Sequence, residues 1–176
     1  MPHPVSPYGA SKLAGEAYCS AYFRTFGIET VALRFGNVYG PGSTHKNSVV
    51  ARFIKQALNH ETLEIYGSGE QTRDFIFNGD LVKAILLAAD TNGIGGEIFQ
   101  IATGAETTVN GLVREMQQVF DRRGVELVTT LAAPRLGDVA RNYSDTTKAR
   151  QVLGWHCETT LRRGLEDTID WFTKRE

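Results

Sequence analysis

The sequence predicts an α/β fold in a single compact unit covering residues 1–176. Segments with apolar residues at spacings of three and four alternate along the chain with short β-branched segments, as expected for successive helices and strands. The length is that of one domain with a core of its own. No repeat, low-complexity tract or linker-like stretch divides the chain. Two short helices are expected to close it.

The first predicted element is a helix from Tyr8 to Phe26, which Gly27 ends as a C-cap. Its apolar residues recur at spacings of three and four, the pattern of an amphipathic helix. They are Leu13, Ala17, Tyr18, Ala21 and Tyr22. The next segment, Ile28–Phe35, has few polar interruptions and therefore predicts a strand covered on both faces.

A predicted loop, Gly36–Ser48, follows this strand and is rich in Gly, Pro, Asn, Ser and Thr. Either Asn47 or Ser48 is expected to cap a helix that reaches about Asn59. Long ordered loops often carry functional residues, so this loop is a candidate part of a site.

The remaining elements are shorter and are separated by glycine-containing turns at residues 67–69 and 93–96. Strands are expected at Leu63–Tyr66, Arg73–Phe77, Glu97–Ala102 and Val125–Leu131. Helices are expected from an Asp80 cap to Ala89, from Thr108 or Asn110 to about Arg123, at Thr146–Leu153 and at Leu161–Thr173.

The composition argues against membrane and nucleic-acid partners. The formal net charge is -1, and 41% of the residues are hydrophobic. No apolar run approaches the roughly 20 residues that span a bilayer. The near-balance of charge excludes a general polyanion-binding surface, although a few arginines converging on one phosphate would not show in it. Residues 1–7 predict an extended, proline-stiffened start without a secretory signal.

The residues that commonly bind metals are scattered. Cys19 and Cys157 lie far apart without metal-ligand spacing, which predicts reduced thiols and favours the cytoplasm. The four histidines likewise show no such spacing, so no metal site is expected. They are His3, His45, His60 and His156.

The first segment with candidate catalytic side chains is Tyr8-Gly9-Ala10-Ser11-Lys12, which places Tyr8 and Lys12 four residues apart on one helix face. An ammonium group beside a phenol favours the ionised phenol, which can then act as a base. The pair alone is a weak signal, because most such pairs are a surface tyrosine beside a solvated lysine.

The longer segment Ser6–Lys12 resembles the active-site helix of the extended short-chain dehydrogenase/reductase family, which includes NAD-dependent sugar-nucleotide epimerases and dehydratases. Further segments resemble this family in its order: Arg34–Pro41, Tyr66–Phe75, Arg135–Val139 and Lys148–Trp155. The resemblance covers Pro7 to Phe172 and corresponds to the carboxy-terminal half of such an enzyme. It implies a partial, truncated Rossmann-like doubly wound sheet plus a small α/β substrate-binding lobe.

The resemblance also implies roles for individual residues. Tyr8 would be the catalytic base and Lys12 its activator, and both would contact the NAD cofactor together with Phe35. The nucleotide sugar would be bound by Asn37, Arg73, Arg135 and Asp138, the arginines meeting its diphosphate. Each has a simpler alternative: a left-handed turn for Asn37, an exposed side chain for either arginine, and a turn cap for Asp138.

The sequence lacks the Gly-rich turn that holds the NAD pyrophosphate at a helix N-terminus in this family. Gly67-Ser68-Gly69 has no third glycine and leads into a predicted strand, so it is not this turn. The resemblance implies that the family's catalytic Ser or Thr lies upstream of the tyrosine, and nothing in the sequence assigns its role to Ser6 or Ser11. NAD is thus the family's cofactor, and binding to this chain alone is not expected.

The expected function is that of a truncated, UDP-sugar 4-epimerase-like chain, inactive alone but able to bind a sugar nucleotide. Gly137-Asp138-Val139 and Asp145 favour an epimerase over a dehydratase or decarboxylase. The alternative is a non-catalytic folded remnant or a self-associating binding module. A missing sheet half would expose an edge and an apolar face, which predicts a homo-oligomer. The family resemblance implies that the copies associate through Leu13–Tyr22, in the helix that contains the Tyr8–Lys12 pair.

Overall fold

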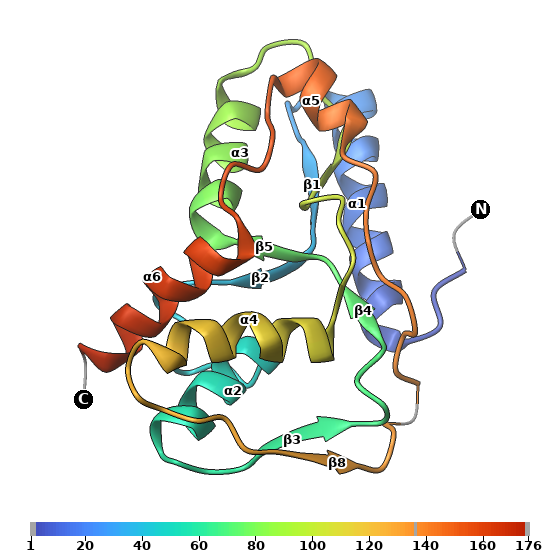
Figure 1. The fold of residues 1–176 in the computed structure, drawn as a ribbon. Helices are drawn as coiled ribbons and strands as arrows, with labels where there is room; N and C mark the ends of the chain where they lie inside the picture. Colours follow the sequence, from blue (N-terminus) through green and yellow to red (C-terminus); the bar gives the residue numbers. More distant parts are fainter. Residues whose placement is uncertain (1–2, 136, 175–176) are drawn as a thin grey trace.

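The computed structural model describes residues 3–135 and 137–174. Met1 and Pro2 of the predicted extended start and Leu136 of the fourth motif lie outside these residues. The helices in Figure 1 are α1 Pro7–Phe26, α2 Val49–Leu58, α3 Asn78–Asp90, α4 Val109–Asp121, α5 Thr147–Leu153 and α6 Leu161–Thr173. The strands are β1 Ala32–Phe35, β2 Asn37–Tyr39, β3 Leu63–Tyr66, β4 Thr72–Arg73, β5 Phe75–Phe77, β6 Ile98–Ile101, β7 Thr107–Thr108 and β8 Thr129–Ala132. The predicted α/β class is confirmed.

Among the described residues the strands pair two by two, and three of these four pairs are parallel. β1 pairs with β6, β2 with β5 and β3 with β8, whereas β4 and β7 are antiparallel. Parallel pairs need long crossover connections, and here these connections contain the helices. The helices α1 and α3 flank β1 on opposite sides (Figure 1). This α/β/α arrangement is the Rossmann-like part of the fold.

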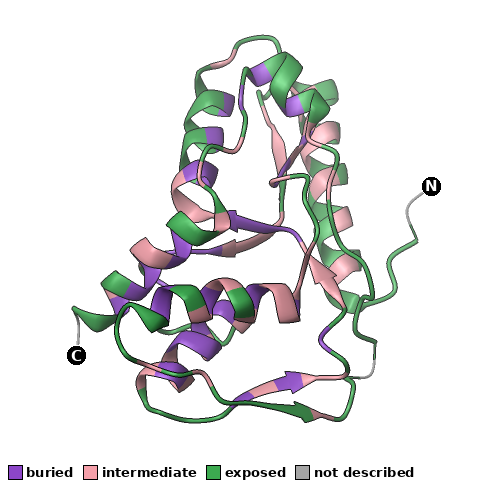
Figure 2. Cartoon of the chain, viewed as in Figure 1, coloured by how far each residue is buried: buried purple, intermediate pink, exposed green. Residues whose placement is uncertain are grey.

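Two apolar cores hold the structure together (Figure 2). The core of the lobe joins α2, α4, α6 and β3, with Phe53, Leu63 and Leu112 fully buried. The second core joins α3, β5, β6 and α5 around Ile76 and Phe99. Each such side chain contributes about 1.5–3 kcal/mol through burial. The lobe therefore has a core of its own.

The helix ends follow from local sequence signals. Gly27 ends α1 at φ 69°, a left-handed conformation that glycine adopts without steric cost, so the predicted C-cap is confirmed. Thr108 rather than Asn110 caps α4, accepting a hydrogen bond from the Gly111 N–H at 2.9 Å. Ser48 rather than Asn47 is the N-cap residue of α2, without a side-chain hydrogen bond.

The prediction of a strand covered on both faces at 28–35 was wrong. Only Ala32–Phe35 form β1, and Phe35 is 48% exposed. Within the described residues β1 pairs on one edge alone, and a cavity lies on each side of it, against α1 and against α3. The apolar segment is suited to a strand inside a wider sheet, whereas the described residues provide β1 with one neighbouring strand, β6.

Three other boundaries differ from the predictions. Part of the expected loop forms the strand β2, and the expected strand at 73–77 is broken at Asp74, where the chain changes partner from β7 to β2. The last predicted strand, Val125–Leu131, begins only at Thr129. Isolated segments of two or three residues carry too little periodicity to be recognised from sequence.

The prediction that Asp80 caps α3 was wrong, because Phe77 occupies the N-cap position. The Asp80 side chain is 1% exposed and accepts a hydrogen bond from the Thr159 N–H at 2.9 Å. Burial alone would raise the pKa of Asp80, but the hydrogen bonds from Thr159 and Cys157, together with Lys83, lower it. Asp80 therefore joins α3 to the segment before α6.

None of the helices in residues 3–135 and 137–174 has the length and apolar character needed to cross a bilayer. The same residues contain no group of three or more His, Cys, Asp and Glu side chains arranged to hold a metal ion.

Candidate functional site

Tyr8 and Lys12 lie in the first two turns of α1, whose start is fixed by its sequence. The Ser6 side chain accepts a hydrogen bond from the Gly9 N–H at 3.1 Å, and Pro7 occupies the first helical position. The Lys12 Nζ atom lies 5.3 Å from the centroid of the Tyr8 ring. The four-residue spacing thus places ammonium and phenol side by side, as predicted.

The Tyr8–Lys12 pair opens onto a cavity of about 630 Å³ between α1 and β1. Phe35, at the end of β1, also lines this cavity, and its half-exposed ring offers an apolar surface there. The structure thus brings together the three residues expected to contact the cofactor. A phenol, an ammonium group and an aromatic face at one opening can hold a planar polar ligand and move a proton from it.

Glu16 and Arg34 form a two-pronged ion pair in the same cavity, which the sequence analysis did not single out. Arg34 Nε and Nη2 lie 2.7 Å and 2.6 Å from the two carboxylate oxygens of Glu16. The hydrogen bond from Arg34 holds the pKa of Glu16 below its usual range. The ion pair joins α1 to β1. The sequence feature that could have indicated it is the position of Glu16, one helical turn after Lys12 and thus on the same face of α1.

A second cavity, of about 400 Å³, lies at the lobe between Tyr66 and the segment that contains Arg135 and Asp138. The Arg135 guanidinium carbon lies 3.9 Å from the centroid of the Tyr66 ring, and that of Arg52 lies 4.9 Å from it. Neither arginine has a carboxylate partner among the described residues. Arg52 donates to the Glu64 carbonyl oxygen and does not line the cavity, so Arg135 is the uncompensated cation there. An aromatic ring beside such a guanidinium group attracts an anionic, planar ligand.

Arg73 and Asp138, both predicted to bind substrate, form an ion pair with each other. Arg73 Nη1 also donates to the carbonyl oxygens of Thr72 and Val139, at 2.7 Å and 2.6 Å. Asp138 lines the lobe cavity, but Arg73 is not among the described residues that line it. The structure thus brings Arg135 and Asp138 to one cavity and places Arg73 in contact with the same segment.

Asn37 lines neither of these two cavities, as far as the described residues show. It lies in β2 opposite Phe75, and its N–H donates to the Asp74 carbonyl oxygen at 2.6 Å. Among the described residues other than glycine, only His60 has a positive φ. The alternative interpretation of Asn37 as a left-handed turn residue is therefore wrong.

Sequence reasoning also missed Asp74 and Tyr66, although both lie inside a recognised motif. The fully buried Asp74 carboxylate accepts hydrogen bonds from the N–H groups of Thr103 and Gly104 at 2.8 Å and 3.0 Å. It also accepts from the Ser144 N–H at 3.3 Å. The sequence signal for a buried, hydrogen-bonded carboxylate was the position of Asp74 between Arg73 and the apolar residues Phe75 and Ile76.

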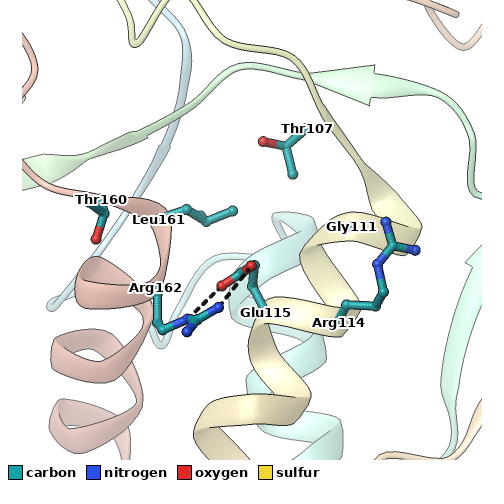
Figure 3. Close-up of a pocket in the computed structure, with 7 residues that line it drawn as sticks. All are labelled: Thr107, Gly111, Arg114, Glu115, Thr160, Leu161 and Arg162. Atoms are coloured by element: carbon teal, nitrogen blue, oxygen red, sulfur yellow. Dashed lines mark hydrogen bonds and ion pairs between the residues drawn. The ribbon is translucent and has the colours of Figure 1, made fainter.

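A third cavity, of about 540 Å³, lies between the first turns of α4 and α6 and is shown in Figure 3. Arg162 and Glu115 face each other across it, with Arg162 Nε 2.8 Å from the Glu115 carboxylate. The charges of Arg162 and Glu115 compensate each other. Arg114 extends from α4 on the side of the cavity away from Arg162. None of the predicted site residues lines this cavity, so the candidate site comprises the other two.

Together, the fold, the cavity beside α1 and the cavity at Tyr66 define an α/β protein with a tyrosine–lysine pair beside its sheet and an aromatic–arginine pocket on its lobe. The comparisons with known proteins agree with this class. Residues 1–102 match the model of the NAD dependent epimerase/dehydratase family. The chain therefore belongs to this family.

Individual relatives narrow the comparison. The UDP-glucose 4-epimerase of Mycolicibacterium smegmatis is 35% identical over 175 residues, which are 98% of this chain and 55% of that protein. The crystal structure of UDP-glucose 4-epimerase from Thermotoga maritima with UDP-glucose has a TM-score of 0.91 at 37% identity, covering 99% of this chain and 56% of that one. UDP-glucuronic acid 4-epimerase from Bacillus cereus, in complex with UDP-glucuronic acid and NAD, has a TM-score of 0.90 at 30% identity, covering 100% and 55%. The chain spans about half the length of the curated relatives it matches.

Proposed function

We propose that this chain is the carboxy-terminal half of a UDP-sugar 4-epimerase-like enzyme. It contributes the Tyr8–Lys12 pair and a pocket for the nucleotide sugar, and it requires an NAD-binding half for turnover. The observation that carries the proposal is the pocket formed by Tyr66 and Arg135, because an aromatic ring with an unpaired guanidinium group suits a nucleoside diphosphate. The similarity to two 4-epimerases with UDP-sugars bound supports this class of ligand.

The cavity beside α1 fits one end of NAD. The exposed ring of Phe35 gives a flat apolar contact, and Lys12 supplies a donor beside Tyr8. The sequence has no Gly-rich turn at a helix N-terminus for the pyrophosphate. Other residues must therefore supply that part of the cofactor site, and the 176-residue chain alone is expected to bind NAD weakly.

In the assembled enzyme, Tyr8 takes the proton from the sugar hydroxyl that is oxidised. The Lys12 ammonium group stabilises the phenolate that makes this transfer possible. NAD would supply the acceptor for the hydride that leaves the same carbon, and would return that hydride to the opposite face of the resulting keto sugar. Tyr8 gives its proton back to the keto oxygen, which restores the hydroxyl group with inverted configuration and gives the 4-epimer. A cavity open at Tyr8 leaves space for the sugar at this position.

Arg135 and Asp138 serve the nucleotide end of the ligand. Arg135 has guanidinium donors in a fork that matches a diphosphate, and Asp138 lines the same cavity with a carboxylate able to accept from ribose hydroxyls. Asn37 is retained as a further substrate-binding prediction. Its β2 position follows directly on β1, which ends at the cavity that contains Tyr8.

Calorimetric titration of the 176-residue chain with UDP tests the proposal, because the lobe pocket requires no NAD-binding half. We expect saturable binding that Arg135→Met weakens about tenfold or more, the loss of a charge-assisted contact of about 1.5–3 kcal/mol. Arg114→Met is the matched control, since Arg114 is an exposed arginine that lines a different cavity. The absence of saturable binding at millimolar UDP, or an equal effect of both variants, contradicts the proposal.

A self-associating module is a second candidate, favoured by the surface of α1. None of its twenty residues is buried, and Tyr18, Tyr22 and Phe26 are exposed. An apolar helix face of this kind is usually covered by another protein surface. Association of two copies through α1 would cover it, and it is compatible with the nucleotide-binding function.

A further inference from the structure

The Tyr66 ring contacts charged side chains instead of an apolar core. Along β3 the side chains alternate: Leu63 and Ile65 are buried in the core of the lobe, and Tyr66 lies on the other face of the strand. Among the described residues Tyr66 belongs to neither core. Its ring instead contacts two guanidinium groups, those of Arg52 and Arg135. The position of this ring therefore depends on polar neighbours.

Arg52 is the more firmly fixed of these two arginines. It lies in α2 beside the fully buried Phe53. Its Nη2 atom donates to the carbonyl oxygen of Glu64 at 2.9 Å, two residues before Tyr66 in β3. Arg135, in contrast, is exposed and lies in the segment after β8. Arg52 thus joins the ring to a helix that is packed into the core, whereas Arg135 remains accessible to a ligand.

The Arg52 guanidinium group is poorly placed to meet a ligand in the lobe cavity. Arg52 is absent from the described residues that line this cavity, although Tyr66 lines it. The Arg52 Nε atom is buried and has no hydrogen-bond partner among the described residues. A buried donor without an acceptor lowers stability and offsets the gain from the Nη2 hydrogen bond. The attraction between the guanidinium cation and the Tyr66 ring remains, with 4.9 Å from the guanidinium carbon to the ring centroid.

We propose that Arg52 is a positioning residue of the lobe cavity: it holds the Tyr66 ring from outside the cavity, so that the ring can stack on the base of a nucleoside diphosphate. Aromatic side chains bind bases by stacking, and a ring that is fixed before binding loses less conformational entropy when the ligand arrives. Arg52 therefore acts on the base through Tyr66 and not by direct contact. This inference rests on the proposed binding of a nucleoside diphosphate.

Two other roles for Arg52 predict different results. If Arg52 bound the diphosphate itself, its removal would weaken UDP binding without changing the mobility of the Tyr66 ring. If Arg52 only stabilised the contact between α2 and β3, its removal would lower the thermal unfolding midpoint and leave the affinity of the folded chain unchanged. A positioning role predicts weaker binding together with a more mobile ring.

The first experiment is a calorimetric titration of wild-type chain, Arg52→Met and Arg52→Lys with UDP. We expect Arg52→Met to weaken UDP binding about fivefold, which is about 1 kcal/mol. Arg52→Lys should lose less, because an ammonium group can still lie beside the ring and donate to the Glu64 carbonyl oxygen. Unchanged affinity in Arg52→Met, or equal losses in the two variants, overturns the positioning role. A fraction of unfolded Arg52→Met that accounts for the weaker binding overturns it as well.

The second experiment measures the ring itself, by NMR relaxation of the ligand-free chain with labelled tyrosine rings. The signals of Tyr66 are identified by their absence in Tyr66→Phe. We expect a lower order parameter for the Tyr66 ring in Arg52→Met than in wild-type chain. Weaker UDP binding with an unchanged order parameter would show that Arg52 contacts the ligand directly, and the positioning role would be refuted.

Lys55→Met is the matched control. Lys55 is a second cation of α2, and its Nζ atom donates to a backbone carbonyl oxygen, that of Lys46, at 3.0 Å. We expect Lys55→Met to change neither UDP affinity nor the mobility of the Tyr66 ring, and equal effects of Lys55→Met and Arg52→Met contradict the inference. If wild-type chain binds no UDP, the proposed function fails and this inference fails with it. If wild-type chain binds UDP and Arg52→Met binds it equally well, only the positioning role is refuted.

Discussion

Replacing Asp80 by Ala should lower the free energy of unfolding by about 3 kcal/mol. The Asp80 carboxylate is 1% exposed and accepts hydrogen bonds from the Thr159 N–H at 2.9 Å and the Cys157 Sγ at 3.3 Å. A hydrogen bond to a charged group contributes about 1.5–3 kcal/mol, and the half-buried donors left without an acceptor add to the loss. The substitution thus removes the side-chain hydrogen bonds that join α3 to the segment before α6.

Urea denaturation followed by circular dichroism measures this loss as a lower midpoint with an unchanged slope. Asp90→Ala is the control, because Asp90 ends the same helix and is exposed. Its effect should stay within about 0.5 kcal/mol. A change below 1 kcal/mol for Asp80→Ala, or an equal change for Asp90→Ala, would refute the reasoning that the buried carboxylate joins the two segments.

The pH dependence follows from the lowered pKa of Asp80 in the folded protein. A carboxyl group whose pKa is lower when folded stabilises the protein fully above its unfolded pKa, about 3.9, and loses this contribution as the pH falls through the folded pKa. The difference in free energy of unfolding between wild type and Asp80→Asn should therefore be constant near neutral pH and shrink below about pH 4. A difference that grows with acidification contradicts the assignment.

Two further predictions concern packing and association. Gly164→Ala should lower the free energy of unfolding by about 1–3 kcal/mol, because an added Cβ would meet the Tyr39 hydroxyl group and lie 2.9 Å from a ring carbon of Phe77. Gly15→Ala, where an added Cβ would meet no atom within 4 Å, should raise it by about 0.5–1 kcal/mol. Thermal unfolding measures both changes, and the same sign for both would contradict this packing. If α1 mediates self-association, Ala17→Asp should shift the molar mass from light scattering toward that of a monomer, whereas a wild-type chain that is already monomeric at the working concentration would exclude such association.

Much of the local structure could be predicted because short spacings determine it. The helix that contains Tyr8 and Lys12, its Gly27 end and the Thr108 cap depend on residues within one or two turns of each other. The small strands β2, β4 and β7 could not be predicted, because two or three residues form a strand only when a partner lies beside them. Their pairing connects residues more than thirty positions apart.

The candidate site was predictable as a set of residue types but not as an arrangement. The order of the motifs selected Tyr8, Lys12, Arg135 and Asp138, and the structure places them at two cavities. It could not show that Arg73 would bind Asp138, since an arginine in a strand can point to a ligand or to a carboxylate of its own chain. The contact of Arg135 with Tyr66 likewise required the fold of the lobe.

The sequence by itself determined the α/β class, the family and the Tyr8–Lys12 pair, because periodicity, glycine positions and motif order are local properties of the chain. Only the tertiary structure decided which edge of β1 is paired, how exposed α1 is, and which partner Arg73 has. Burial and ion pairing depend on distances between side chains that are remote in sequence. Those distances are fixed by the packing of the two cores, not by any spacing along the chain.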